Sequence, residues 1–117
     1  MIVHGSEFTF VTSLVKSKSC LTESSYQNED EVGAGLRDFL IANPSVTRDD
    51  IFITTKVWVH LYEPEDLEWS LNDSLRNLGL EYVDCFLVHW PFAAERTEDR
   101  RVKLNSDGKV YTSSGLN

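Results

Sequence analysis

The sequence has few cysteines, no long apolar run and no basic N-terminal region, and each shortage argues against a class of protein. Only two cysteines, Cys20 and Cys85, occur in 117 residues, so a disulfide framework is not indicated and a reducing cytoplasm is the expected setting. No stretch approaches the roughly 20 apolar residues that span a bilayer, and a secretory signal is not expected either. We therefore predict a cytoplasmic protein with no membrane partner.

Basic residues are also scarce. Eleven lysines and arginines face nineteen aspartates and glutamates, which gives a net charge of −8. Such a field repels the phosphate backbone of nucleic acids, so we expect no nucleic-acid partner. It does not exclude a nucleotide cofactor, because one anionic ligand needs only a local basic pocket. The composition, 41% hydrophobic and 26% charged, is that of an ordinary globular chain with room for one domain.

Apolar spacing predicts a helix and then a strand in the first half of the chain. The helix is expected over Glu29–Ala42, with Asn28 as N-cap, Glu31 completing a capping box and Asn43-Pro44 ending it. Its buried stripe is predicted to be Val32, Leu36, Phe39 and Leu40. The β-branched run Ile51–Val57 is typical of a strand covered on both faces.

A second helix and strand follow. The helix is predicted from Pro64 to a stop at Gly79, with a buried stripe of Leu67, Leu71, Leu75 and Leu78. The apolar segment Tyr82–His89 is predicted to be the next strand, with Cys85 as a plain buried side chain. Strand, helix and strand over so few residues form a βαβ unit, whose two strands are parallel.

The two flanks are less regular. Phe8–Thr12 is a possible strand, whereas Cys20–Ser25 lacks the pattern of one. The last residues are polar, and Asn105–Gly108 predicts a small surface hairpin.

Two residues stand out as candidates for chemistry. Lys56 and His89 end consecutive parallel strands, so both are expected at the same rim of the sheet, where α/β folds bind ligands. The alternatives are a strand-end lysine that reaches water and a histidine bonded to nearby backbone. His60 and Trp69 have no comparable position and are expected to be a loop residue and an exposed helix residue.

Four ordered segments resemble the aldo-keto reductases, which are NADP-dependent oxidoreductases. These segments are Tyr26–Gly33, Asp50–Trp58, Ser74–Asp84 and Leu87–Pro91. The resemblance implies an α/β fold that is part of a (β/α)8 TIM barrel, with Tyr26 just after strand 2, Lys56 at the end of strand 3 and His89 at the end of strand 4. It divides the chain into an atypical N-terminal segment (1–25), a partial barrel (26–93) and a polar tail (94–117).

The resemblance also implies a reaction, the reduction of a small aldehyde or ketone to an alcohol by NADPH. Tyr26 would protonate the carbonyl oxygen, with its phenolate stabilised by Lys56, and His89 would hold and polarise that oxygen. Trp58 and Trp90 would line an apolar substrate pocket, although both could instead be packing residues. No residue is assigned to cofactor binding, and no metal is expected.

The sequence departs from the family pattern at one catalytic position. An aspartate is expected five residues before the tyrosine, and here that residue is Leu21, while Glu23 lies two positions out of register. The residues that hold the cofactor's phosphates in the family come from the second half of the barrel, and this chain stops soon after strand 4. We therefore expect the chain to be inactive alone. The alternatives are a catalytically dead fragment that associates with itself or another chain through open sheet edges, and an unrelated parallel α/β binding module.

Overall fold

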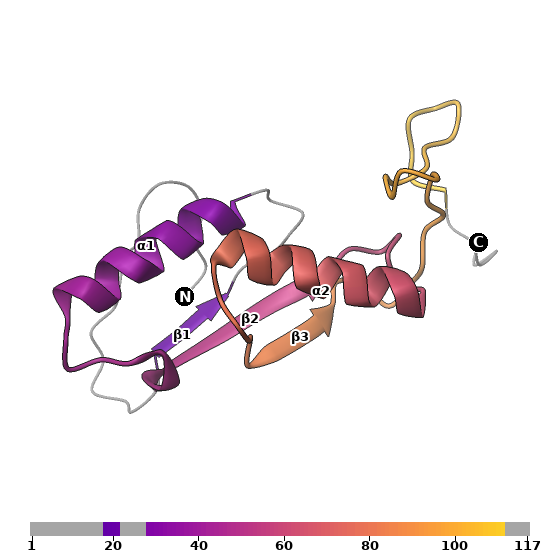
Figure 1. The fold of residues 1–117 in the computed structure, drawn as a ribbon. Coiled ribbons are helices and arrows are strands. Elements are labelled where there is room, and N and C mark those ends of the chain that lie inside the picture. The colour runs from indigo at the N-terminus through magenta and orange to yellow at the C-terminus, as the bar shows by residue number, and fades with distance from the viewer. Residues whose placement is uncertain (1–17, 22–27, 112–117) are drawn as a thin grey trace.

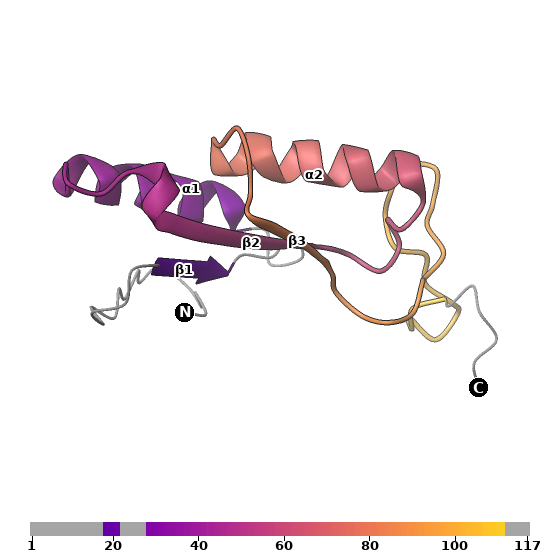
Figure 2. The same cartoon turned by 90° about the horizontal axis from the view of Figure 1, so that it is seen from below.

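A parallel three-stranded sheet forms the centre of the structure, with two helices over one of its faces (Figures 1 and 2). The computed structural model describes residues 18–21 and 28–111. Its elements are β1 (Lys18–Leu21), α1 (Glu29–Ala42), the 3-10 turn η2 (Arg48–Asp50), β2 (Ile51–Val57), α2 (Pro64–Leu78) and β3 (Cys85–Val88). The strand order is β1-β2-β3, and both pairs are parallel. The predicted βαβ unit is therefore present.

Strand β1 corrects an expectation, because its last residues belong to a stretch that lacks a strand pattern. The pairing runs from Lys18 opposite Ile51 to Leu21 opposite Thr54. The backbone of β2 offers hydrogen bonds to any neighbouring segment, so pairing can override a weak local preference. The possible strand Phe8–Thr12 lies outside the described residues.

Helix α1 has the predicted bounds, but its predicted capping box is wrong. Asn28 is the N-cap, yet its backbone, at φ −120° and ψ 10°, is not extended, and its side chain makes no capping hydrogen bond. An extended N-cap is the geometry that lets such a side chain reach the first turn. A capping box forms instead at η2, where the Asp50 carboxylate accepts from both the amide and the hydroxyl of Thr47, each at 2.9 Å.

The core lies between the helices and one face of β2. Alternate residues of this strand, Ile51, Ile53, Thr55 and Val57, are at most 1% exposed. On the opposite face Phe52 is 44% exposed. Thr54 on that face is 8% exposed, so within the described residues the second face is covered in part, whereas the prediction had both faces covered. The core cluster consists of Val32, Leu36, Ile51, Ile53 and Leu78, with Phe39 and Leu40 packed beside it.

Helix α2 ends as predicted but buries a different line of residues. Gly79 follows it in the left-handed conformation, at φ 67°. The fully buried line is Asp66, Ser70, Ser74 and Leu78, whereas Leu67, Leu71 and Leu75 are half-buried. At the Leu78 end of this line the helices approach closely: a Cβ on Gly33 of α1 would lie 2.3 Å from the Leu78 carbonyl oxygen.

Strand β3 is shorter and more open than the predicted strand Tyr82–His89. The Asp84 carboxylate accepts the Ile53 amide at 2.7 Å, and the Asp84 amide donates to the Ile53 carbonyl at 2.9 Å. A side chain thus occupies the ladder position before β3, so the strand begins at Cys85. Cys85 is half-buried, not buried as predicted, and Leu87 and Val88 are 43% and 61% exposed.

The segment 92–111 follows β3 and lies beyond the carboxyl ends of the strands (Figures 1 and 2). Antiparallel bridges join Arg96 to Val102 and Leu104 to Val110. The Gly108 amide donates to the Asn105 carbonyl, which confirms the predicted hairpin. No helix among the described residues is long and apolar enough to cross a membrane.

Candidate active site

The register of β2 and β3 brings Lys56 and His89 to one rim of the sheet. Lys56 pairs with Leu87, and the amide of His89 donates to the Val57 carbonyl at 3.1 Å. Strand residues two apart share a face, so the alternation places Lys56, Leu87 and His89 on the sheet face opposite the helices. Lys56 and His89 therefore lie at one rim of the sheet, as their positions at the ends of two parallel strands predict.

Aromatic rings surround the histidine. The Trp58 ring meets the His89 ring edge-on, with centroids 4.4 Å apart. Trp90 stacks on His89 at 5.5 Å, and Phe92 stacks on Trp90 at 6.3 Å. Trp90 is 52% exposed. The rim thus presents an apolar, partly open surface beside one imidazole, which suits a small organic molecule with a single polar group.

Two positions complete the comparison with the predicted site. Tyr26 lies outside the described residues. Leu21 ends β1 opposite Thr54, two residues before Lys56 on the neighbouring strand. Strand β1 therefore does end beside β2, as the family pattern requires, but a leucine stands where that pattern has a carboxylate.

A buried acid lies on the helix side of the same sheet. Glu29 begins α1, is 3% exposed, and accepts the hydroxyl of Thr55 at 2.8 Å. Burial raises the pKa of the Glu29 carboxyl above its ordinary value, and the Thr55 hydrogen bond opposes that shift. Because Thr55 precedes Lys56, this contact fixes the strand next to a predicted catalytic residue.

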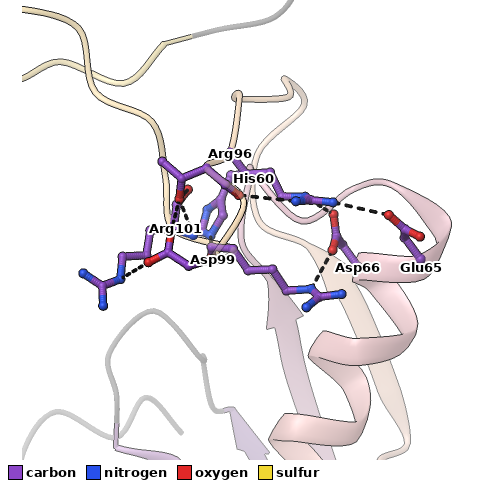
Figure 3. Close-up of polar contacts among 8 residues, drawn as sticks. His60, Glu65, Asp66, Arg96, Asp99 and Arg101 are labelled. Carbon is purple, nitrogen blue, oxygen red and sulfur yellow. Dashed lines mark hydrogen bonds and ion pairs between the residues drawn. The ribbon is translucent and has the colours of Figure 1, made fainter.

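A second polar cluster ties the segment 92–111 to α2, and sequence reasoning missed it. The Asp66 carboxylate, fully buried, accepts from Arg96 and, at 2.8 Å, from Nε of Arg100. His60 Nε2 lies 2.9 Å from the Arg100 carbonyl oxygen. Figure 3 shows Arg96 reaching Asp66 in the first turn of α2, with His60 on the far side of the Arg96 side chain. An aspartate in a helix's first turn was the one available signal, and it points equally to the helix dipole.

The described residues contain no group that could hold a metal ion, and four cations of the segment 92–111 lie in ion pairs. No group of three or more His, Cys, Asp or Glu among them could hold a metal ion. Four cations of the segment 92–111 are paired with carboxylates: Arg96 and Arg100 with Asp66, Arg101 with Asp99, and Lys103 with Glu95. Each of these four cations therefore already has a carboxylate partner.

Comparison with known proteins gives consistent matches. The sequence model described as "Aldo/keto reductase family" matches residues 22–110. Glycerol 2-dehydrogenase (NADP(+)) of Hypocrea jecorina is 57% identical over 91 residues, covering 78% of this chain and 29% of that protein. D/L-glyceraldehyde reductase of the same organism is 48% identical over 91 residues, covering 78% of this chain and 28% of that protein.

The fold has solved counterparts as well. The structure of the aldose reductase from Schistosoma japonicum superposes with a TM-score of 0.74 and 31% identity, over 83% of this chain and 32% of that one. The described elements therefore form part of a (β/α)8 barrel, as predicted. The chain spans less than a third of the length of each of these three relatives.

Proposed function

The chain belongs to the aldo/keto reductase family, and from that premise we propose that its site serves the NADPH-dependent reduction of an aldehyde or ketone to an alcohol. The observation that carries the proposal is the shared rim, where Lys56 and His89 end neighbouring strands and Trp58 packs on the histidine. A charged group, an imidazole and an apolar wall are what a small carbonyl compound needs for orientation and polarisation.

Each of the chain's own residues has a distinct role in this proposal. His89 donates a hydrogen bond to the carbonyl oxygen, and Tyr26 delivers the proton that this oxygen takes up. The ammonium of Lys56 favours the phenolate that Tyr26 leaves behind, because an adjacent opposite charge stabilises the ionised form. Trp58 and Trp90 form the apolar wall and keep the substrate carbonyl beside His89.

NADPH is the hydride donor in such a reaction, and its placement is part of the proposal. The paired cations of the segment 92–111 give no reason to assign any of them to the cofactor's phosphates. We therefore assign no described residue to cofactor binding, and we propose that the 117-residue chain does not turn over a carbonyl substrate by itself. Leu21 in place of a carboxylate adds to that expectation.

A chimera separates the site from the missing scaffold. Residues 22–110 would replace the matching segment of a complete family member, whose own residues then supply the aspartate and the rest of the barrel. We expect NADPH-dependent aldehyde reduction that falls by about 100-fold or more on Tyr26→Phe, as for loss of a general acid. Tyr82→Phe, which removes a hydroxyl bonded to Asp49 at 2.8 Å, is the matched control. If the folded chimera reduces the aldehyde at the same rate with and without the Tyr26→Phe substitution, the result would contradict the proposal.

A second candidate function is that of a catalytically inactive fragment which associates with another chain or with itself. The observation that favours it is the apolar edge strand β3, where Leu87 and Val88 are 43% and 61% exposed. An exposed apolar edge strand is a template for pairing with another strand. Small-molecule turnover plays no part in this candidate.

A pair of lysine substitutions tests the edge. Val88→Lys places a charge on β3, and we expect it to shift any self-association toward monomer in light scattering coupled to gel filtration. Ile41→Lys changes an equally apolar residue, 78% exposed near the end of α1, and should leave the mass unchanged. If both variants and the unchanged chain have the same mass in solution, strand β3 is not an edge through which the chain associates.

A further inference from the structure

One hydroxyl satisfies both main-chain polar groups of Trp90. Tyr62, in the loop between β2 and α2, donates its hydroxyl hydrogen to the Trp90 carbonyl oxygen at 2.8 Å. The hydroxyl oxygen of Tyr62 in turn accepts a hydrogen bond from the Trp90 amide, at 3.1 Å. A tyrosine hydroxyl can donate and accept at once, so this side chain supplies the hydrogen bonds that a neighbouring strand would otherwise give.

The place of this contact along the chain matters. Strand β3 ends at Val88, and the His89 amide still bonds to the backbone of Val57. Trp90 is the next residue, and its ring stacks on the His89 ring. Tyr62 therefore acts where the regular ladder has stopped and where the aromatic wall begins.

The loop after β2 and the segment after β3 meet beside a partly open pocket. A cavity of about 210 Å³ lies between them, and Val59, Tyr62, Ala93 and Arg96 are among the residues that line it. Buried side chains, Val59 at 2% and Ala94 at 8% exposed, and polar contacts both join the two segments beside this pocket. The Ala94 amide bonds to the Val59 carbonyl at 2.9 Å at the same cavity.

A second anchor holds the chain further along. The Asp66 carboxylate forms ion pairs with the guanidinium groups of Arg96 and Arg100, and His60 forms a hydrogen bond with the Arg100 carbonyl (Figure 3). Arg100 has a φ of 60°, the one positive value for a non-glycine among the described residues. A residue keeps such a strained backbone when its surroundings fix it from several sides. The segment after Trp90 is thus held independently of Tyr62.

We propose that Tyr62 is a positioning residue of the active site, which fixes the peptide units around Trp90 and thereby the direction of the Trp90 ring beside His89. The functional meaning of this role rests on the proposed carbonyl reductase site, since Trp90 lines the substrate in that proposal. The positioning itself is a property of the 117-residue chain. Asp66 anchors the following segment, so loss of the Tyr62 hydroxyl frees Trp90 locally without releasing the segment 92–111.

Fluorine NMR of the chain labelled with fluorotryptophan tests this directly, because each of Trp58, Trp69 and Trp90 gives one signal. We expect Tyr62→Phe to shift and broaden the Trp90 signal, with the Trp69 signal unchanged. Tyr82→Phe removes a tyrosine hydroxyl bonded to Asp49 and should leave the Trp90 signal as it is. A Trp90 signal that is the same in Tyr62→Phe and in the unchanged chain would overturn the proposal.

Hydrogen exchange of the unchanged chain provides a second test that needs no variant to fold. Because the Trp90 amide donates to Tyr62, it should exchange at least about tenfold more slowly than an unstructured amide. Exchange at the unstructured rate would overturn the positioning role. Both measurements are independent of turnover. If the chimera is inactive but the Trp90 signal changes in Tyr62→Phe, the result would count against the proposed reaction and would still support the positioning role of Tyr62.

Discussion

Glu29 places a carboxylate between helix α1 and strand β2, where water is largely excluded. Burial raises the pKa of this carboxyl above its ordinary value of 4.5, and hydrogen bonds from neighbours such as Thr55 offset only part of the shift. The folded state therefore holds the proton more tightly than the unfolded state. The stability that this group contributes is fully present below about pH 4.5 and is lost as the pH rises through the folded pKa.

Glu29→Gln removes this titration and keeps an acceptor for the Thr55 hydroxyl. We expect the variant to gain stability relative to the unchanged chain as the pH rises from about 4 to about 8, by about 1.4 kcal/mol for each unit by which the folded pKa is raised. Urea unfolding at several pH values measures it. Glu31→Gln, at an exposed position of the same helix, should show no such trend. If the difference in unfolding free energy between Glu29→Gln and the unchanged chain does not vary with pH, the Glu29 carboxyl does not have a raised pKa in the folded state.

Single residues differ in how far the sequence reveals them. Lys56 and His89 could be predicted as a pair, because each ends an apolar run and parallel strands end at one rim. Tyr62 and Asp66 could not, because their partners Trp90 and Arg96 lie 28 and 30 positions away and no periodicity links such positions. The roles of Tyr26, Lys56 and His89 stay predictions until variants are assayed.

Among the elements, the contact between α1 and α2 depends on one glycine. Glycine inside a helix normally costs about 1 kcal/mol relative to alanine, so Gly33→Ala would ordinarily stabilise α1. Here the added Cβ would lie 2.3 Å from the Leu78 carbonyl oxygen, and the helices would have to move apart. We expect a loss of about 2 kcal/mol in thermal or urea unfolding, as for overpacked cores.

Gly108→Ala provides the comparison for that variant. Its Cβ would meet nothing within 4 Å, but its φ is 74°, so the loss should be about 1 kcal/mol from backbone strain alone. A stabilising Gly33→Ala would mean that the two helices are not packed as described.

The link between α2 and the segment 92–111 is the second element-scale feature that can be tested. Asp66→Asn leaves Arg96 and Arg100 without their carboxylate, and we expect a loss of about 2 kcal/mol, less than for a wholly buried pair because these arginines are 27% and 36% exposed. Trypsin should then cut faster after Arg100 and its neighbours. Asp73→Asn breaks an exposed pair with Arg76 on the same helix and should leave the cutting rate unchanged; equal rates for the two variants would argue against the anchor.

The elements also show what local pattern can and cannot predict. The bounds of α1 and the stop of α2 at Gly79 follow from apolar spacing, proline and glycine, which act locally. Strand β1 forms because β2 lies beside it, and the buried line of α2 meets α1 at Leu78 and Arg96 and Arg100 at Asp66. Both depend on neighbours far along the chain, so neither had a local signal.

At the scale of the whole molecule, the described residues make an open portion of a barrel, with three strands and with helices on one face. Among these residues no helix covers the sheet face that carries Lys56 and His89, and in a closed barrel that side is filled by side chains from the other strands. Family likeness could predict this architecture because four ordered motifs fix the order of the βα units. In the proposed reaction the rest of the barrel would help to select the carbonyl compound, and this chain spans 29% of its glycerol 2-dehydrogenase relative.

Lys56 and His89 share one rim of the sheet, and we propose that this chain cannot complete the turnover of a carbonyl substrate by itself. The most direct test is NADPH oxidation by the purified 117-residue chain with an aldehyde substrate, followed by absorbance, beside a Tyr26→Phe variant. We predict no oxidation above the rate without protein for either chain. A clear rate that disappears on Tyr26→Phe would contradict the claim.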